Sequence, residues 1–322
     1  LGDVYKRQDP RNAQLERATS EEGERQYEYD SFGHLIREQW TGKDQVTWTT
    51  RYQPSLHGRI HLREDQTRTP TRYTYDAAGR VSSMTCEQVT VTYRYDTLGR
   101  LEHVTTSDLA SGSEQVTTHG YDDHDRETSR TTRVTGQPTR TLEQTWYPGE
   151  RLKSRTLTEE GTLLLGETFA YDSRARLSTY SCTGSELPRD ELGRPISQEI
   201  FLYDGFDNIK MVTTTIEGTR YRTLYTPRED DPCKLASIQH LPARPGLPIP
   251  PFEYDANGNL LNDEAGRRLC YDTQSRLLSV TDASSQVLTK YHYDGNGDLH
   301  AVQATGQQAT QVFFEGYRLS PV

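Results

Sequence analysis

Two stretches, YTYDAAGRV at residues 73–81 and YRYDTLGRL at residues 93–101, decide the fold of this chain. In each, two aromatic residues stand two positions apart, so their side chains lie on the same face of a β-strand. The carboxylate of the aspartate that follows can accept backbone N–H groups two residues further on, which opens a turn. Asp at the first turn position and Gly at the fourth are typical of a type I turn followed by a bulge with positive φ. Each stretch therefore predicts the tip of a β-hairpin.

The Tyr-Asp pair occurs nine times along the chain, whereas the composition predicts roughly one or two occurrences by chance. Such self-similarity indicates a repeat architecture. Five copies also have Gly four residues after the Tyr, and the residues of this predicted turn motif are Tyr29, Asp30, Gly33, Tyr75, Asp76, Gly79, Tyr95, Asp96, Gly99, Tyr254, Asp255, Gly258, Tyr293, Asp294 and Gly297. Two weaker copies, at residues 52–60 and 147–152, lie within long gaps between Tyr-Asp pairs. When they are included, the repeat unit is about 20–25 residues long, which is enough for two strands and two turns.

Four copies have another residue in place of the glycine: Asp125, Ala175, Asp207 and Ser275. Because Ala and Ser resist positive φ, we expect looser or different turns in these copies. The pairs Asn257-Gly258 and Asn296-Gly297 also permit a tighter two-residue turn, with a shifted strand register.

The composition alone is ambiguous, since only 32% of the residues are hydrophobic and the net charge is −10, a combination found in disordered chains. Against disorder, tyrosine is abundant and threonine crowds the segments between turns, and both suit a half-exposed pleated sheet. A sheet with a solvated face can remain this polar. We therefore predict an all-β fold of repeated antiparallel β-hairpins over residues 9–322, forming a long curled sheet.

Two segments depart from the repeat. Residues 1–8, LGDVYKRQ, resemble a translated sequencing-adapter remnant, so we expect an artefact or a disordered start and a chain that is a fragment. Residues 226–251 contain seven prolines, which cannot occupy a central strand, so we predict a Pro-rich loop insertion there.

The sequence contains no recognisable catalytic motif, neither G-x-S-x-G, nor a P-loop, nor H-E-x-x-H. Two turns match the first three ligand positions of a calcium loop, through Asp255, Asn257 and Asn259 and through Asp294, Asn296 and Asp298. Gly266 and Thr305 stand where such a loop needs an acidic residue, so turn formation explains both. His57 with His61, and the cluster His119, Asp122, Asp123, His124 and Asp125, are better explained as strand and turn residues. We expect no catalytic residue, no cofactor and no metal.

Other function classes are disfavoured by composition. An acidic chain would be repelled by a phosphate backbone, which argues against nucleic acid as a partner. No stretch approaches the 18 apolar residues of a membrane span. The cysteines are far apart and form no C-x-x-C pair, so we expect small buried residues rather than a zinc site or a disulfide framework; they are Cys86, Cys182, Cys233 and Cys270.

The units at 73–81, 93–101 and 252–260 resemble the YD repeats of RHS proteins, of the toxin-complex component that encloses a toxic C-terminus, and of teneurins. The runs FAYDSRARL (169–177), ELGRPISQEIFLYDGFDNIKMV (191–212) and FEYDANGNLLNDEAGRRLCYDTQSRLLSV (252–280) most resemble the bacterial insecticidal toxin-complex branch. The resemblance covers residues 27–319.

Membership of this family would imply a β-sheet ribbon wound into a hollow shell that encloses a C-terminal toxin domain and helps to deliver it. The implied partners are that toxin, neighbouring shell repeats and other toxin-complex components, and the implied location is secreted or associated with the cell envelope. The family's core segment, with its aspartyl self-cleavage site and Asp-Pro-x-Gly motifs, is not found here, and FFEGYRLSPV (313–322) resembles the strand that leads into it. No catalytic residue is carried over.

A different class of function remains open. YD repeats could form an extracellular adhesion or carbohydrate-binding surface that uses exposed aromatic side chains, with Trp40, Trp48 and Trp146 as candidates. These tryptophans are scattered along the sequence rather than clustered, which weakens this alternative.

Overall fold

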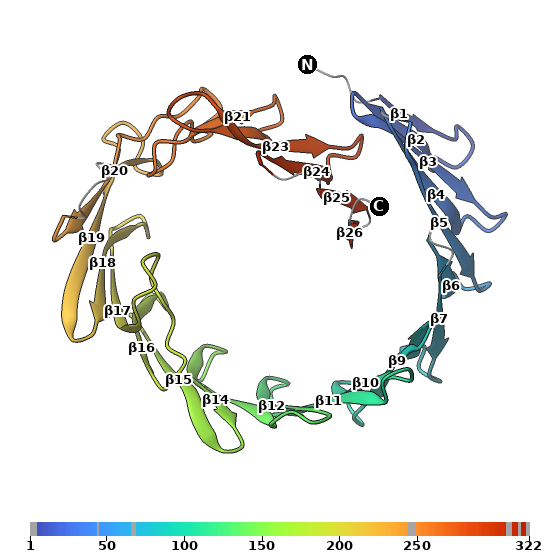
Figure 1. The fold of residues 1–322 in the computed structure, drawn as a ribbon, viewed down its shortest axis with the longest axis horizontal. Coiled ribbons are helices and arrows are strands. Elements are labelled where there is room, and N and C mark those ends of the chain that lie inside the picture. Colours follow the sequence, from blue (N-terminus) through green and yellow to red (C-terminus); the bar gives the residue numbers. More distant parts are fainter. Residues whose placement is uncertain are drawn as a thin grey trace. The chain divides into compact units, whose positions relative to one another are not determined.

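The computed structural model describes residues 5–43, 45–65, 69–243, 249–306, 311–314 and 317–319. All regular elements in these residues are β-strands, numbered in chain order, and Figure 1 labels most of them. Among the described residues, no helix is long and apolar enough to cross a bilayer.

The strands fall into two sheets, both built from neighbours in sequence. A 20-stranded sheet contains β1 to β20 and a 6-stranded sheet contains β21 to β26. The first seven strands are β1 (Tyr5–Gln8), β2 (Leu15–Ser20), β3 (Gly23–Tyr29), β4 (Leu35–Gly42), β5 (Thr47–Pro54), β6 (Ile60–Glu64) and β7 (Pro70–Tyr75). The next thirteen are β8 (Val81–Cys86), β9 (Val89–Tyr95), β10 (Leu101–Asp108), β11 (Ser113–Tyr121), β12 (Glu127–Val134), β13 (Arg140–Trp146), β14 (Leu152–Glu159), β15 (Thr162–Tyr171), β16 (Leu177–Thr183), β17 (Ile196–Tyr203), β18 (Ile209–Ile216), β19 (Thr219–Pro227) and β20 (Leu235–Leu241). The second sheet comprises β21 (Arg268–Tyr271), β22 (Leu277–Thr281), β23 (Val287–Tyr293), β24 (Leu299–Ala304), β25 (Gln311–Phe314) and β26 (Tyr317–Leu319).

The pairing is antiparallel throughout, and the register slips by one residue at the tips that follow Tyr-Asp. In the hairpin of β9 and β10, Leu101 pairs with Tyr95, and His103 then pairs with Arg94. The same one-residue bulge follows the tip between β11 and β12 and the tip between β17 and β18. The predicted all-β fold of repeated antiparallel hairpins is confirmed.

By its contacts the chain divides into two units, which are described separately: residues 1–73 with 249–322, and residues 74–248. The second unit has a sparse core, in which the buried apolar side chains of the described residues are Leu164, Cys182, Val212 and Ile216. Most strand residues there are half-buried, because a single sheet layer leaves both faces near water. This layering accounts for the low hydrophobic content.

The first unit holds the most deeply buried side chains. Ala18 and Thr50 are 0% exposed and Trp40 is 1% exposed. The Trp40 ring packs against His300, with ring centroids 4.3 Å apart. The expectation that Trp40 is an exposed binding aromatic is therefore wrong, while Trp48 and Trp146 are half-buried.

Both segments that depart from the repeat contain strands. Residues 5–8, expected as an artefact or a disordered start, form β1, which pairs with β2. Leu1–Val4 lie outside the described residues, and the origin of the first eight residues stays a prediction. Within the Pro-rich segment, β20 pairs with β19, so the segment is not wholly a loop. This is possible because the prolines flank residues 235–241 and leave that stretch free of them.

The cysteines differ from one another in exposure, and all four are free thiols. Cys182 is buried and Cys86 is half-buried, but Cys233 and Cys270 are exposed. The expectation of buried cysteines is wrong for the latter two, because short strands and turns at their positions leave at least one side open to solvent.

Candidate functional site

The recurring feature of this chain is the Tyr-Asp turn, and the tip between β9 and β10 shows its hydrogen bonds. The amide of Gly99 donates to the carbonyl of Asp96 (3.0 Å), and the amide of Asp96 donates to the carbonyl of Arg100 (2.9 Å). Oδ1 of Asp96 accepts the amides of Leu98 and Arg100, both at 2.9 Å. Oδ2 accepts Nε of Arg100 at 2.7 Å. The aspartate therefore fixes a three-residue loop through both carboxylate oxygens.

The glycine of this turn has a left-handed backbone in all five complete copies. Its φ is +86° at Gly33, +81° at Gly79, +88° at Gly99, +86° at Gly258 and +94° at Gly297. Glycine reaches these angles without a Cβ clash. The tips with Asn257-Gly258 and Asn296-Gly297 keep the three-residue loop, since Asp255 and Asp294 donate to the carbonyls four residues on, rather than adopting the tighter turn.

The copies without glycine form the same turn, so the expectation of looser or different turns is wrong. Asp125, Ala175, Asp207 and Ser275 adopt φ of 61–70°. Their amides donate to the carbonyl of the turn aspartate at 3.2, 3.0, 3.4 and 3.1 Å respectively. An L-residue in this region costs about 1–2 kcal/mol. The hydrogen bonds of the aspartate carboxylate to two backbone amides offset that cost and hold the backbone in place.

In six copies of the motif, the tyrosine connects its hairpin to the one before it. The hydroxyl of Tyr121 donates to the carbonyl of Leu101 at 2.8 Å, and that of Tyr95 donates to the carbonyl of Val81 at 2.9 Å. The same bond is made by Tyr29 to Leu15, Tyr171 to Leu152, Tyr203 to Leu177 and Tyr293 to Leu277. Burial raises the pKa of Tyr121, which keeps the hydroxyl protonated as a donor.

An arginine completes the connection between neighbouring repeats. The guanidinium carbon of Arg100 lies 4.8 Å from the centre of the Tyr121 ring, and that of Arg80 lies 4.2 Å from the Tyr95 ring. Such cation–π contacts contribute about 0.5–1 kcal/mol at exposed sites. We call this arrangement of Tyr hydroxyl, turn Asp and Arg the inter-repeat staple. The turn pattern by itself places this Arg only at the start of the return strand, and its recurrence four residues after the Asp is the sequence signal for this further role.

The electrostatics of the turn favour an ionised aspartate. The hydrogen bond from the Arg126 side chain is the main cause that lowers the pKa of Asp122 to about 2, and burial opposes it. Backbone amides of His124 and Arg126 add to the lowering. The turn carboxylate is therefore charged at neutral pH and acts as an acceptor only.

The candidate metal ligands of the sequence analysis are engaged in turns. Oδ2 of Asp255 accepts Nδ2 of Asn259 at 2.8 Å, so that asparagine presents a donor rather than an oxygen ligand. In the other loop, Oδ1 of Asp294 accepts the amide of Asn296. His119 contacts Glu127 at 2.7 Å. Within the described ranges, no group of three His, Cys, Asp or Glu residues is arranged to hold a metal ion.

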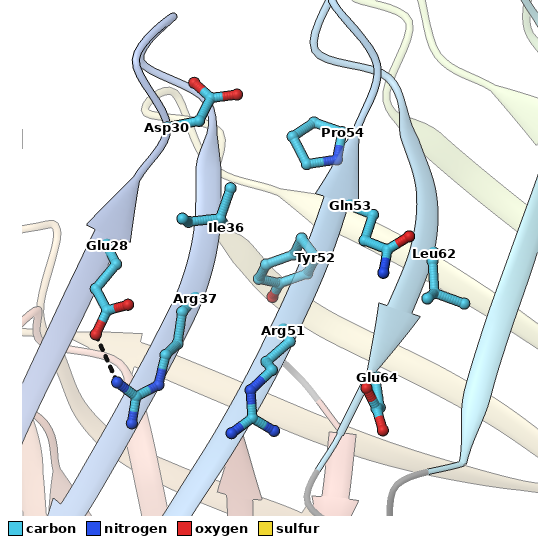
Figure 2. Close-up of a pocket in the computed structure, with 10 residues that line it drawn as sticks. All are labelled: Glu28, Asp30, Ile36, Arg37, Arg51, Tyr52, Gln53, Pro54, Leu62 and Glu64. Atoms are coloured by element: carbon cyan, nitrogen blue, oxygen red, sulfur yellow. Dashed lines mark hydrogen bonds and ion pairs between the residues drawn. The ribbon is translucent and has the colours of Figure 1, made fainter.

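An open groove of about 550 Å³ lies over β3 to β6, and Figure 2 shows its lining. Across it, Glu28 pairs in register with Arg37, Arg37 with Arg51, and Arg51 with Glu64. Glu28 and Arg37 form an ion pair at 2.5 Å. Tyr52 adds an aromatic ring to the lining. The groove combines this row of mixed charge with the apolar residues Ile36, Pro54 and Leu62, and its lining shows no arrangement of acid, base and nucleophile.

These observations define a repeat protein of sequential antiparallel hairpins, joined by Tyr-Asp turns and inter-repeat staples. The RHS repeat family model matches residues 271–308. The resemblance to RHS-repeat proteins is confirmed, with the family match at residues 271–308. A search of curated protein sequences finds no match.

Solved structures share the fold over the full chain. The crystal structure of TcdB2-TccC3 without its hypervariable C-terminal region matches with a TM-score of 0.58 and 14% identity, over 99% of this chain and 20% of that one. The TcdB2-TccC3-TEV structure matches with a TM-score of 0.51 and 14% identity, over 99% and 20% of the two chains. The present chain thus spans about a fifth of the length of the chains that it matches.

Proposed function

We propose that this chain is a wall segment of an RHS-type shell in a secreted bacterial toxin complex, and that the shell encloses a C-terminal toxin domain and helps to deliver it. The observation that carries the proposal is the fold match to TcdB2-TccC3 over 99% of the chain. The implied partners are neighbouring shell repeats, the enclosed toxin and other toxin-complex components. The role is structural rather than catalytic.

The physical properties of the sheet support a wall. Hairpins bond to their sequence neighbours, and staples at Tyr95, Tyr121, Tyr203 and Tyr293 tie a hairpin to the previous one. Such a sheet can be lengthened by adding repeats. The second unit buries few apolar side chains, and its half-buried strand residues tolerate water on both faces. A wall around a cavity needs this property, since both its inner and its outer surface are wet. We infer that a polar inner face would also let an enclosed cargo detach.

Two measurements test the proposal. The gene should continue beyond Val322 into a core segment and an unrelated C-terminal domain, whereas a membrane or wall anchor in that place would favour adhesion. In the full-length protein, limited proteolysis followed by mass spectrometry should leave the C-terminal domain uncut until the repeats themselves are cleaved. A C-terminal domain that is digested first would refute enclosure.

The alternative of an adhesion or carbohydrate-binding surface is tested directly on a glycan array. The burial of Trp40 removes one of its candidate aromatics, while Trp48 and Trp146 are half-buried and remain candidates. Tyr52 is a further aromatic to probe, because it lines the groove of Figure 2. Binding to a defined glycan that is lost in Tyr52→Ala would support the alternative over the shell wall. If the chain bound no glycan on the array, this alternative would be ruled out.

A further inference from the structure

One Tyr-Asp tip, between β23 and β24, is in contact with strands at the other end of the sequence. Oδ2 of Asp294 lies 2.6 Å from a terminal guanidinium nitrogen of Arg25 in β3. Nδ2 of Asn296 donates to the hydroxyl of Tyr27 at 2.5 Å, across 269 residues of sequence. Both contacts lie within the unit that combines residues 1–73 and 249–322.

The ion pair at this contact is buried, and one guanidinium faces two carboxylates. The side chain of Arg25 is 8% exposed and lies between Asp294, which is fully buried, and Glu38, which is 8% exposed and also 2.6 Å from the guanidinium. Burial lowers the pKa of Arg25, but the two carboxylates raise it more, so the guanidinium stays charged. Loss of Arg25 would leave two buried carboxylates without a cation, and buried charges that lose their partner are strongly destabilising.

The glycine after Asp294 permits the close approach. A Cβ on Gly295 would lie 2.9 Å from the carbonyl carbon of Ala18 and 3.1 Å from its Cβ, and Ala18 is 0% exposed. Gly295 is not among the residues with positive φ, so the turn itself does not require glycine there. Gly205 occupies the same position in the tip between β17 and β18, and a Cβ on it would meet nothing within 4 Å.

Two further contacts surround the tip. His292 lies 3.0 Å from Glu22, and His300 packs on Trp40. The tip is therefore enclosed by β2, β3 and β4 rather than touching them at one point.

We infer that the tripeptide Asp294-Gly295-Asn296 is a docking element, and that Ala18, Arg25, Tyr27 and Glu38 form a socket that selects it. The socket needs a carboxylate for Arg25, no side chain against Ala18, and an amide for Tyr27. Among the nine Tyr-Asp tips, the one at Asp294 alone has the sequence Asp-Gly-Asn; Asp204-Gly205 is followed by Phe206, and Asp255 is followed by alanine. The docked tip makes β2–β4 and β23–β24 a single cooperative unit. This inference goes beyond the proposed function and does not depend on enclosure of a toxin.

Hydrogen-exchange mass spectrometry on the full chain tests the inference, because it reports each strand separately. Gly295→Leu should raise the exchange rates of amides in β2, β3 and β4 by at least about tenfold, although these strands are distant in sequence. The matched control Gly205→Leu should leave all exchange rates near those of the unsubstituted chain. Unchanged exchange in β2–β4, or an equal effect of the control, would overturn the inference.

A second variant covers the case in which Gly295→Leu does not fold. Asp294→Asn keeps the oxygen that caps the turn but removes one of the two charges that Arg25 faces, the one that the tip supplies. Asp204→Asn is its control. The first should deprotect β2–β4 and the second should not. The chain should also remain a monomer in size-exclusion chromatography with light scattering. A dimer that dissociates in Asp294→Asn would instead assign the contact to two copies and overturn the docking within one chain.

Discussion

Replacing Gly99 by valine should open the hairpin of β9 and β10, and the size of the effect follows from the turn geometry. Gly99 has φ of +88°. An L-residue in the left-handed region costs about 1–2 kcal/mol, and a β-branched residue resists this region most. The added Cβ would also lie 3.0 Å from a terminal nitrogen of Arg80, which is the flexible end of that side chain and can move. We expect a local destabilisation of about 2 kcal/mol.

Because repeats open locally, hydrogen exchange measures this effect better than a global melting curve. A cost of about 2 kcal/mol corresponds to roughly 30-fold faster exchange in β9 and β10. Gly99→Asn should cost much less, since asparagine tolerates positive φ. Gly205→Val, in a tip where the residue has open space and no positive φ, serves as the control. Unchanged exchange in Gly99→Val, or equal loss in Gly205→Val, would refute the turn assignment.

Three further outcomes are expected. Tyr121→Phe removes the hydroxyl that donates to Leu101 and should cost about 1 kcal/mol of local stability, measured as roughly fivefold faster hydrogen exchange in β11. The control is Tyr147→Phe, because the Tyr147 hydroxyl makes no hydrogen bond among the described residues, and it should have no such effect. Because the pKa of Asp122 is lowered from 3.8 to about 2 in the fold, its contribution to stability is complete above about pH 5 and is lost progressively as the pH falls toward about 2. An acid titration followed by hydrogen exchange in β11 and β12 should show that window, and a loss already complete by about pH 5 would contradict it. Exposed Cys270 should react with iodoacetamide much faster than buried Cys182, whose pKa burial raises, and equal rates by mass spectrometry would show that β16 is open.

The hairpin tips were predictable because their hydrogen bonds are local. Every bond that Asp96 makes in its tip reaches no further than Arg100. The φ of +64° at Ala175 was not predictable from the conformational preference of alanine. It depends on how firmly the Asp172 carboxylate holds the backbone of the turn through its hydrogen bonds. The strand β20 was not predicted, because the many prolines of residues 226–251 favoured a loop over the whole segment although residues 235–241 contain none.

The amino-acid sequence by itself determined that this chain repeats, that each Tyr-Asp unit turns, and that the product is an antiparallel β-sheet, because these features depend on residues within one hairpin. Only the tertiary structure decided that Trp40 is buried and that Asp294 faces Arg25. Sequence periodicity carries no information on which tip of a repetitive sheet meets which distant strand. That choice depends on the close approach of Gly295 to Ala18, which the absence of a side chain on Gly295 permits, and on the pairing of buried charges. Both contacts exist only once the chain has folded.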